Sequence, residues 1–158
     1  YTTLFRSKPF GMYALNSMRI EKGYITWKGD LSTDYTLLEG GIERFIKFDK
    51  PQDFPGKAAL LAEKQQGSKK KFVTLIVDTD FADAPYMSSI WHGDKVVGET
   101  TSGDWGYRIN ASIALGMVRS DLAVPGSKLE VEIFGKRCKA IVQNDEALWD
   151  PKNERICA

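Results

Sequence analysis

The stretch of sequence that decides the fold is LEVEIFGKRCKAIV, residues 129–142. Its first half, residues 129–134, alternates apolar with charged side chains, and this period of two is typical of a β-strand with one buried face. Its second half, residues 137–142, repeats the alternation. Between them, Gly135-Lys136 supplies the glycine that a tight turn favours, so the stretch predicts a β-hairpin.

Similar signals recur upstream of this hairpin. Residues 71–78 alternate around valine and leucine, and residues 111–119 form a further apolar run. Between these, residues 88–91 and 95–101 flank a His-Gly-Asp sequence at 92–94 that predicts a second hairpin. About five or six strands at such short spacing predict a small antiparallel barrel or sandwich.

The first third of the chain has a different character. Apolar residues recur at helical spacing over residues 9–20, with Ser7 as a start signal and Gly23 as a stop signal. Residues 56–66, rich in Ala, Leu, Glu and Lys, predict a second helix, and residues 45–48 predict a short strand. The sequence therefore predicts an α+β fold, with helices in the first 66 residues and a β-barrel after them.

The composition argues against several classes of partner. The chain has 158 residues, of which 42% are hydrophobic and 27% are charged, and its formal net charge is +1. This near-neutral balance gives no electrostatic reason to expect a nucleic acid or an anionic membrane as a partner. The run Lys69-Lys70-Lys71 is too short for a polyanion site and predicts a solvated loop entering a strand. No apolar stretch approaches the ~20 residues that span a bilayer.

Few residues predict chemistry by themselves. His92 is the only histidine and is expected in an exposed turn, so neither a Ser-His-Asp triad nor a zinc site is predicted. Cys138 and Cys157 lack metal-ligand spacing, no disulfide between them is expected, and such sparse cysteine usage fits a reducing compartment. Gly103-Asp104-Trp105-Gly106 lacks the lysine and spacing of a phosphate loop and predicts a tight turn. Three acidic residues are predicted to cap turns or helix ends: Asp30, Asp34 and Glu39.

Several short motifs occur in the same order as in a known family, and they indicate a function that the residue types alone do not. The sequence Arg19-Ile20-Glu21-Lys22-Gly23 resembles the Arg-x-Glu-x-Gly signature of the aminomethyltransferase family, which includes the T-protein of glycine cleavage. Residues 27–31 and 36–42 are similar to the family's aromatic-x-x-Asp-Leu and Thr-Pro-Leu-Glu-Ala-Gly-Leu stretches, although Leu37 stands where proline is usual. Residues 53–60 are similar to its Asp-Phe-Ile-Gly-Lys-x-Ala-Leu helix entry.

The resemblance continues through the second part of the chain. Residues 97–103 and 112–118 look like two barrel motifs of the same family. The variant Glu-Lys-Gly-Tyr-x-x-Trp at 21–27 and the closing motif Trp149-Asp150-Pro151-Lys152-Asn153-Glu154-Arg155 resemble the C-terminal region of dimethylglycine and sarcosine dehydrogenases. The resemblance implies a remnant of the folate-binding domain at residues 1–66 and the family's C-terminal β-barrel at residues 67–158.

The family also implies an activity and its cofactors. It implies the C-terminal part of an enzyme that captures an iminium carbon on tetrahydrofolate as 5,10-methylenetetrahydrofolate, with FAD expected only in a preceding N-terminal region. The family's main catalytic aspartate lies upstream of the Arg-x-Glu signature, so no catalytic residue is expected here and the chain alone is expected to be inactive. Its expected partners are folate and that preceding region of the same polypeptide. Its expected location is the cytoplasm, or the mitochondrial matrix in a eukaryote.

The resemblance further implies a ligand for the pteridine ring of folate. The family's matching glutamate contacts this ring, and Glu21 would do so here. One carboxylate can accept hydrogen bonds from the adjacent amino group and ring N–H of a pteridine. The simpler interpretation is an exposed glutamate near a helix end, paired with Arg19 or Lys22.

Four other residues are candidates for the cofactor site. Tyr24 and Trp27 are candidates for lining the pocket, and core packing explains them equally well. Arg19 would orient Glu21 or cap the helix C-terminus. Lys50 is a candidate for the glutamate tail of folate. Two further functions remain open: a stand-alone T-protein or tetrahydrofolate-dependent demethylase, and a non-catalytic folate-binding or assembly module of the same fold.

Overall fold

A computed structural model describes residues 9–144 and 147–156 of the chain. Within them, six antiparallel strands form a closed barrel in the order β1-β4-β3-β2-β5-β6, with β6 pairing back to β1. The strands, in chain order, are β1 (Lys70–Val77), β2 (Ser89–His92), β3 (Lys95–Gly106), β4 (Ala111–Arg119), β5 (Lys128–Ile133) and β6 (Lys136–Val142). The predicted α+β fold with a small antiparallel barrel is confirmed.

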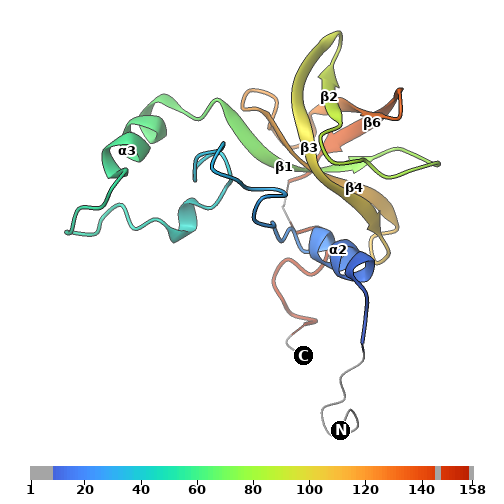
Figure 1. Cartoon of the computed structure of the whole chain (residues 1–158), viewed down its shortest axis with the longest axis horizontal. Coiled ribbons are helices and arrows are strands. Elements are labelled where there is room, and N and C mark those ends of the chain that lie inside the picture. The colour runs from blue at the N-terminus through green and yellow to red at the C-terminus, as the bar shows by residue number, and fades with distance from the viewer. Residues whose placement is uncertain (1–8, 145–146, 157–158) are drawn as a thin grey trace, which may run out of the picture.

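Two helices precede the barrel. Helix α2 (Met12–Glu21) lies against the outside of β3 and β4, whereas α3 (Lys57–Gln66) lies well away from the barrel (Figure 1). Both helices agree with the sequence prediction. Gly23 has φ of +65°, and this left-handed conformation ends α2 where a glycine stop signal was expected. None of the described helices is long and apolar enough to cross a membrane.

Two local predictions were wrong. The strand expected at residues 45–48 is instead the end of a short 3₁₀ turn, η1 (Glu43–Phe45), followed by loop. Such an isolated segment has no neighbouring strand for its backbone hydrogen bonds, because the six barrel strands already pair with one another.

The turn expected at residues 103–106 is also absent, because these residues are the last part of β3 and pair with residues 111–114 of β4. The glycines serve close approach rather than a turn. A Cβ at Gly103 would lie 2.1 Å from the carbonyl oxygen of Ala84, and a Cβ at Gly106 would lie 2.6 Å from Ile113 Cδ1. At these two positions the reason for glycine is therefore crowding by neighbouring atoms and not a turn.

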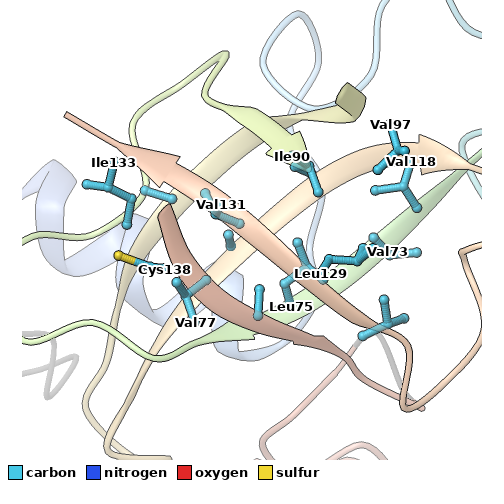
Figure 2. Packing of buried hydrophobic residues seen from close by; sticks show 14 residues of the cluster. Val73, Leu75, Val77, Ile90, Val97, Val118, Leu129, Val131, Ile133 and Cys138 are labelled. Atoms are coloured by element: carbon cyan, nitrogen blue, oxygen red, sulfur yellow. The ribbon is translucent and has the colours of Figure 1, made fainter. Parts of the chain in front are cut away.

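The main core fills the barrel. Inward side chains of β5 and β6 alternate with exposed ones, as the period of two predicted. Figure 2 shows the resulting cluster of branched aliphatic side chains, with Cys138 among them. The buried members of this cluster are Val73, Leu75, Val77, Ala84, Ile90, Val97, Ala114, Val118, Leu129, Val131, Ile133, Cys138, Ala140 and Val142. Cys157 lies outside the described residues, so the predicted absence of a disulfide stays a prediction.

A second, smaller core lies on the outside of the barrel. Strand β4 is buried over seven consecutive residues, because one face lines the barrel and the other packs against the N-terminal part of the chain. Ile20 of α2 contributes to this outer cluster, together with Phe72, Ile113, Leu115 and Met117. This packing fixes the C-terminal end of α2 beside the barrel, and the candidate site is built there.

Candidate functional site

Glu21, the last residue of α2, is almost completely buried, with 2% of its surface exposed. Its Oε1 accepts hydrogen bonds from the backbone N–H groups of Arg108 at 2.6 Å and Ile109 at 3.4 Å. Its carbonyl oxygen accepts the N–H groups of Leu148 and Trp149, both at 2.9 Å. Glu21 thus joins α2 to the β3–β4 turn and to the C-terminal segment, and the interpretation as an exposed, ion-paired glutamate is wrong.

A cavity of about 250 Å³ adjoins Glu21. Three of the five residues predicted to contact the cofactor line it: Arg19, Glu21 and Tyr24. The other two lie elsewhere, Trp27 in a short bridge with Leu31 and Lys50 in the loop before α3, where its carbonyl oxygen accepts the Lys57 ammonium at 3.0 Å. The structure therefore groups the residues of the Arg-x-Glu signature and separates the two outlying candidates from them.

Two further residues of this cavity were missed as binding candidates. Trp149 lines it, and the guanidinium of Arg108 lies 3.9 Å from the Trp149 ring centroid. Trp149 entered the sequence argument only as part of a family motif, and Arg108 did not enter it. A tryptophan in that closing motif was the one available signal, because nothing local places residue 149 beside residue 21.

Lys22 also lies at this cavity, although only 6% of its surface is exposed. Its ammonium donates to the carbonyl oxygen of Asp150 at 2.6 Å and to Asn153 Oδ1 at 2.7 Å. An Asp150 carboxylate oxygen lies 4.0 Å from the same nitrogen. A second, more polar cavity of about 500 Å³ shares Lys22 and Tyr24 and includes Arg44.

Arg19 points toward a buried carboxylate. Its Nη1 donates to Asp30 Oδ2 at 2.8 Å and to the carbonyl oxygen of Tyr24 at 3.0 Å, and its Nη2 donates to Ser102 Oγ at 2.7 Å. The Tyr24 carbonyl lies beyond the end of α2 and is not one of the helix's own carbonyls, so the helix-capping role of Arg19 stays a prediction. The ion pair with Asp30 was not predicted.

Asp30 is the centre of the network that holds the N-terminal part of the chain on β3. It is fully buried, and its two oxygens accept the hydroxyls of Thr101 at 2.7 Å, Ser102 at 2.5 Å and Thr26 at 2.9 Å. Burial alone would raise its pKa, but the hydrogen bonds from Ser102, Thr26 and Thr101 and the charge of Arg19 outweigh it and hold the pKa below 3.8. The prediction of a simple turn cap covers only the contact with Thr26. Asp34 and Glu39, by contrast, hold local turns as predicted.

The cavity beside Glu21 has the chemistry of a site for a flat heterocycle. Its walls are mainly apolar or aromatic, from Leu15, Met18 and Trp149, and one carboxylate lies among them. A carboxylate offers about four lone-pair positions, and the two backbone N–H groups use only part of that capacity. The remaining lone-pair positions can accept N–H groups of a bound molecule. No group of three or more metal-ligating side chains gathers anywhere in residues 9–144 and 147–156.

Two parts of the chain match known protein families. Residues 70–150 match the family described as the glycine cleavage T-protein C-terminal barrel domain, and residues 2–50 match the GCVT N-terminal domain. The chain belongs to the glycine cleavage T-protein family. The family resemblance carried by the Arg-x-Glu-x-Gly signature and the barrel motifs is confirmed.

Several individual proteins are similar to nearly the whole chain. Mitochondrial dimethylglycine dehydrogenase of Mus musculus is 43% identical over 148 residues, which are 93% of this chain and 17% of the relative, and the Homo sapiens protein is 41% identical over the same length. A probable aminomethyltransferase of Pyrococcus abyssi is 36% identical over 92% of this chain and 38% of the relative. The chain thus spans a minor part of each relative's length.

The fold has a counterpart among solved structures. The glycine cleavage system aminomethyltransferase T of Bartonella henselae superposes with a TM-score of 0.77 over 85% of this chain and 38% of that one, at 24% identity. This likeness shows the fold, a closed barrel with α2 packed on its outside.

Proposed function

We propose that this chain supplies part of the tetrahydrofolate site of a one-carbon transfer enzyme of the dimethylglycine dehydrogenase type. The observation that carries the proposal is the grouping of Arg19, Glu21 and Tyr24 around one cavity with Trp149. The high similarity to dimethylglycine dehydrogenases over nearly the whole chain supports this type over a stand-alone aminomethyltransferase. The non-catalytic folate-binding module remains the second candidate, because no catalytic residue is assigned to the chain.

Glu21 is the proposed ligand of the pteridine ring. Its position is set before any ligand arrives, because the N–H groups of Arg108 and Ile109 hold Oε1 and the helix end holds the backbone. A carboxylate fixed in this way loses little conformational entropy on binding. Its negative charge strengthens hydrogen bonds from neutral N–H donors of a heterocycle.

The remaining residues of the cavity orient the ring and keep out water. Apolar side chains from α2, Leu15 and Met18, form part of the cavity wall. When bound, tetrahydrofolate supplies the amine that accepts the one-carbon unit, giving 5,10-methylenetetrahydrofolate. The work of this chain is positioning and exclusion of water, and both accelerate transfer between bound groups. Trp27 and Lys50 stay proposed contacts that depend on the rest of the enzyme.

The proposal includes a partner for α2. Its outward face exposes large apolar side chains, with 90% of Tyr13 and 76% of Met12 accessible. Contiguous exposed apolar surface of this kind marks an interaction site. We propose that a further part of the GCVT N-terminal domain covers it, since residues 2–50 match that domain and the chain spans only 17% of the length of its Mus musculus relative. The boundary between the two domains at residues 66 and 67 belongs to the same proposal. So does the location, which is the cytoplasm or, in a eukaryote, the mitochondrial matrix; the mammalian relatives are named as mitochondrial.

Titration of ¹⁵N-labelled protein with tetrahydrofolate, followed by NMR, tests the site. We expect chemical-shift changes at the amides of Tyr24, Arg108 and Trp149, with those of β5 and β6 unmoved, even if the affinity is weak. Absence of any shift, or shifts confined to another part of the barrel, would refute the assignment of the cavity. Addition of an N-methyl amine substrate to the complete enzyme then separates transferase from binding module, because only the former yields 5,10-methylenetetrahydrofolate.

A further inference from the structure

Of the closing motif Trp149–Arg155, only Trp149 has entered the proposed function, yet the chain returns to the same cavity just after the motif, at Ile156. Its entry is fixed by two backbone hydrogen bonds, from Leu148 and Trp149 to the carbonyl oxygen of Glu21. The segment thereby meets α2 at the residue that carries the proposed ring contact. Such a junction between residues 21 and 149 couples the position of the segment to the geometry of the site.

Asp150 bends the segment back. Its carboxylate accepts the backbone N–H of Arg155 at 3.2 Å and that of Ile156 at 3.1 Å, which closes a turn over residues 150–156. Asn153 has φ of +61° within this turn, a conformation that asparagine adopts more readily than most residues. The turn returns the chain to the cavity, where Ile156 forms part of the lining.

Lys22 holds the turn from inside. Its ammonium is buried and donates to the carbonyl oxygen of Asp150 and to the side chain of Asn153. Burying an ammonium is unfavourable unless oxygen acceptors replace water, and the oxygens of Asp150 and Asn153 are the acceptors that do so here. The Lys22 ammonium also lies 5.5 Å from the Trp149 ring centroid.

We propose that residues 147–156 are a binding element of the folate pocket, in which Trp149 is the aromatic wall that the ligand ring contacts and Lys22 is the residue that positions this wall. The inference rests on the proposed function. It adds Trp149 and Lys22 to the folate site, as two residues that act together. It also gives the closing motif a physical role: the motif supplies the tryptophan and the turn that returns the chain to the cavity.

The experiment measures dissociation constants for tetrahydrofolate by NMR titration of the wild-type chain and four variants. Trp149→Ala removes the wall, Lys22→Met removes the ammonium while keeping much of the side-chain length, and the double variant combines them. Trp91→Ala is the matched control, because Trp91 is also stacked by an arginine, with Arg137 3.8 Å from its ring centroid, on a different face of the barrel.

We expect Trp149→Ala and Lys22→Met each to raise the dissociation constant about tenfold, and the double variant to raise it by no more than either single change. This non-additivity is the mark of a residue that acts through another, and a general loss of stability would not produce it. The control is expected to bind like the wild type.

Three results would overturn the inference, and they are distinguishable. If Trp149→Ala binds tetrahydrofolate as tightly as the wild type, Trp149 is not a wall of the pocket. The proposed function still stands in that case, because the wild type binds. A loss in the double variant equal to the product of the single losses shows that Lys22 acts independently of Trp149. Lack of binding by the wild type itself refutes the proposed function and, with it, the ligand role of the segment.

Discussion

Glu21 illustrates how burial changes the meaning of a side chain. Near a helix end in the sequence, a glutamate is ordinarily a solvated surface residue. Here its carboxylate is buried against the N–H groups of Arg108 and Ile109, so it stabilises the β3–β4 turn as well as facing the cavity. The structural and the binding contributions of this residue must therefore be measured separately.

Glu21→Gln separates them. The amide keeps an oxygen for the two backbone N–H groups but loses the charge, so we expect the free energy of unfolding to fall by about 1 kcal/mol. Tetrahydrofolate affinity is expected to fall at least about tenfold, because a neutral amide also presents donors to the N–H edge of the ring. Urea unfolding and NMR titration measure the two effects, with Glu130→Gln on β5 as control. Unchanged affinity would remove Glu21 from the site.

Asp30 predicts a dependence of stability on pH. Its pKa is lowered in the folded protein, so its contribution is fully present above 3.8, the value in the unfolded chain, and is lost as the pH falls through the lower folded value. At pH 7 we expect Asp30→Asn to be less stable than the wild type by about 3 kcal/mol, since it leaves Arg19 without its buried partner.

The check is urea unfolding of both proteins from pH 7 to pH 2. The difference in unfolding free energy between wild type and Asp30→Asn should stay level down to about pH 4 and shrink below it. Because the other titrating groups are common to both proteins, the difference isolates Asp30. A difference that begins to shrink near pH 6 would contradict a lowered pKa.

At the scale of elements, strand β3 shows where local rules mislead. Gly103 and Gly106 were interpreted as turn residues because turns are the usual place for glycine. In β3 the two glycines are required because neighbouring atoms leave no room for a Cβ. These atoms are the carbonyl of Ala84 at Gly103 and the side chain of Ile113 at Gly106. The sequence contains the glycines but not the neighbours that explain them.

Gly103→Ala tests this explanation. The new Cβ would approach the Ala84 carbonyl oxygen to 2.1 Å, so the backbone must move, and we expect a loss of about 3 kcal/mol in unfolding free energy. Gly11→Ala is the control, because nothing lies within 4 Å of a Cβ there and its φ is −90°. Equal stability of the two variants in urea unfolding would show that β3 is not crowded at Gly103.

Strand β4 differs from the β5–β6 hairpin in how many of its faces are buried. The alternation in β5 and β6 predicted one buried and one exposed face, and the structure has it. Strand β4 is buried on both faces, because α2 and neighbouring loops cover the face that does not line the barrel, and the sequence prediction did not include this burial. Periodicity therefore predicted the strands well, but not which segment covers β4.

At the scale of the whole molecule, we propose that the barrel is a platform for one end of a larger domain, because the chain spans only 17% of the length of its Mus musculus relative. The family's upstream catalytic aspartate is not assigned to this chain, and α2 exposes an apolar face suited to that domain. We therefore expect the 158-residue chain alone to form no 5,10-methylenetetrahydrofolate from tetrahydrofolate and an iminium donor. A spectrophotometric assay for the product checks this, with a complete aminomethyltransferase as positive control. Turnover by the chain alone would contradict it.

The sequence by itself determined the α+β class, five of the six strands to within a residue or two at each end, and the membership of a folate-dependent family. Only the tertiary structure decided that Glu21 is buried, that Asp30 pairs with Arg19, and that Trp149 joins the same cavity. The physical reason is range. A strand or a helix is specified by the spacing of neighbouring side chains, whereas contacts between residues 21, 108 and 149 exist only after barrel closure brings distant parts of the chain together.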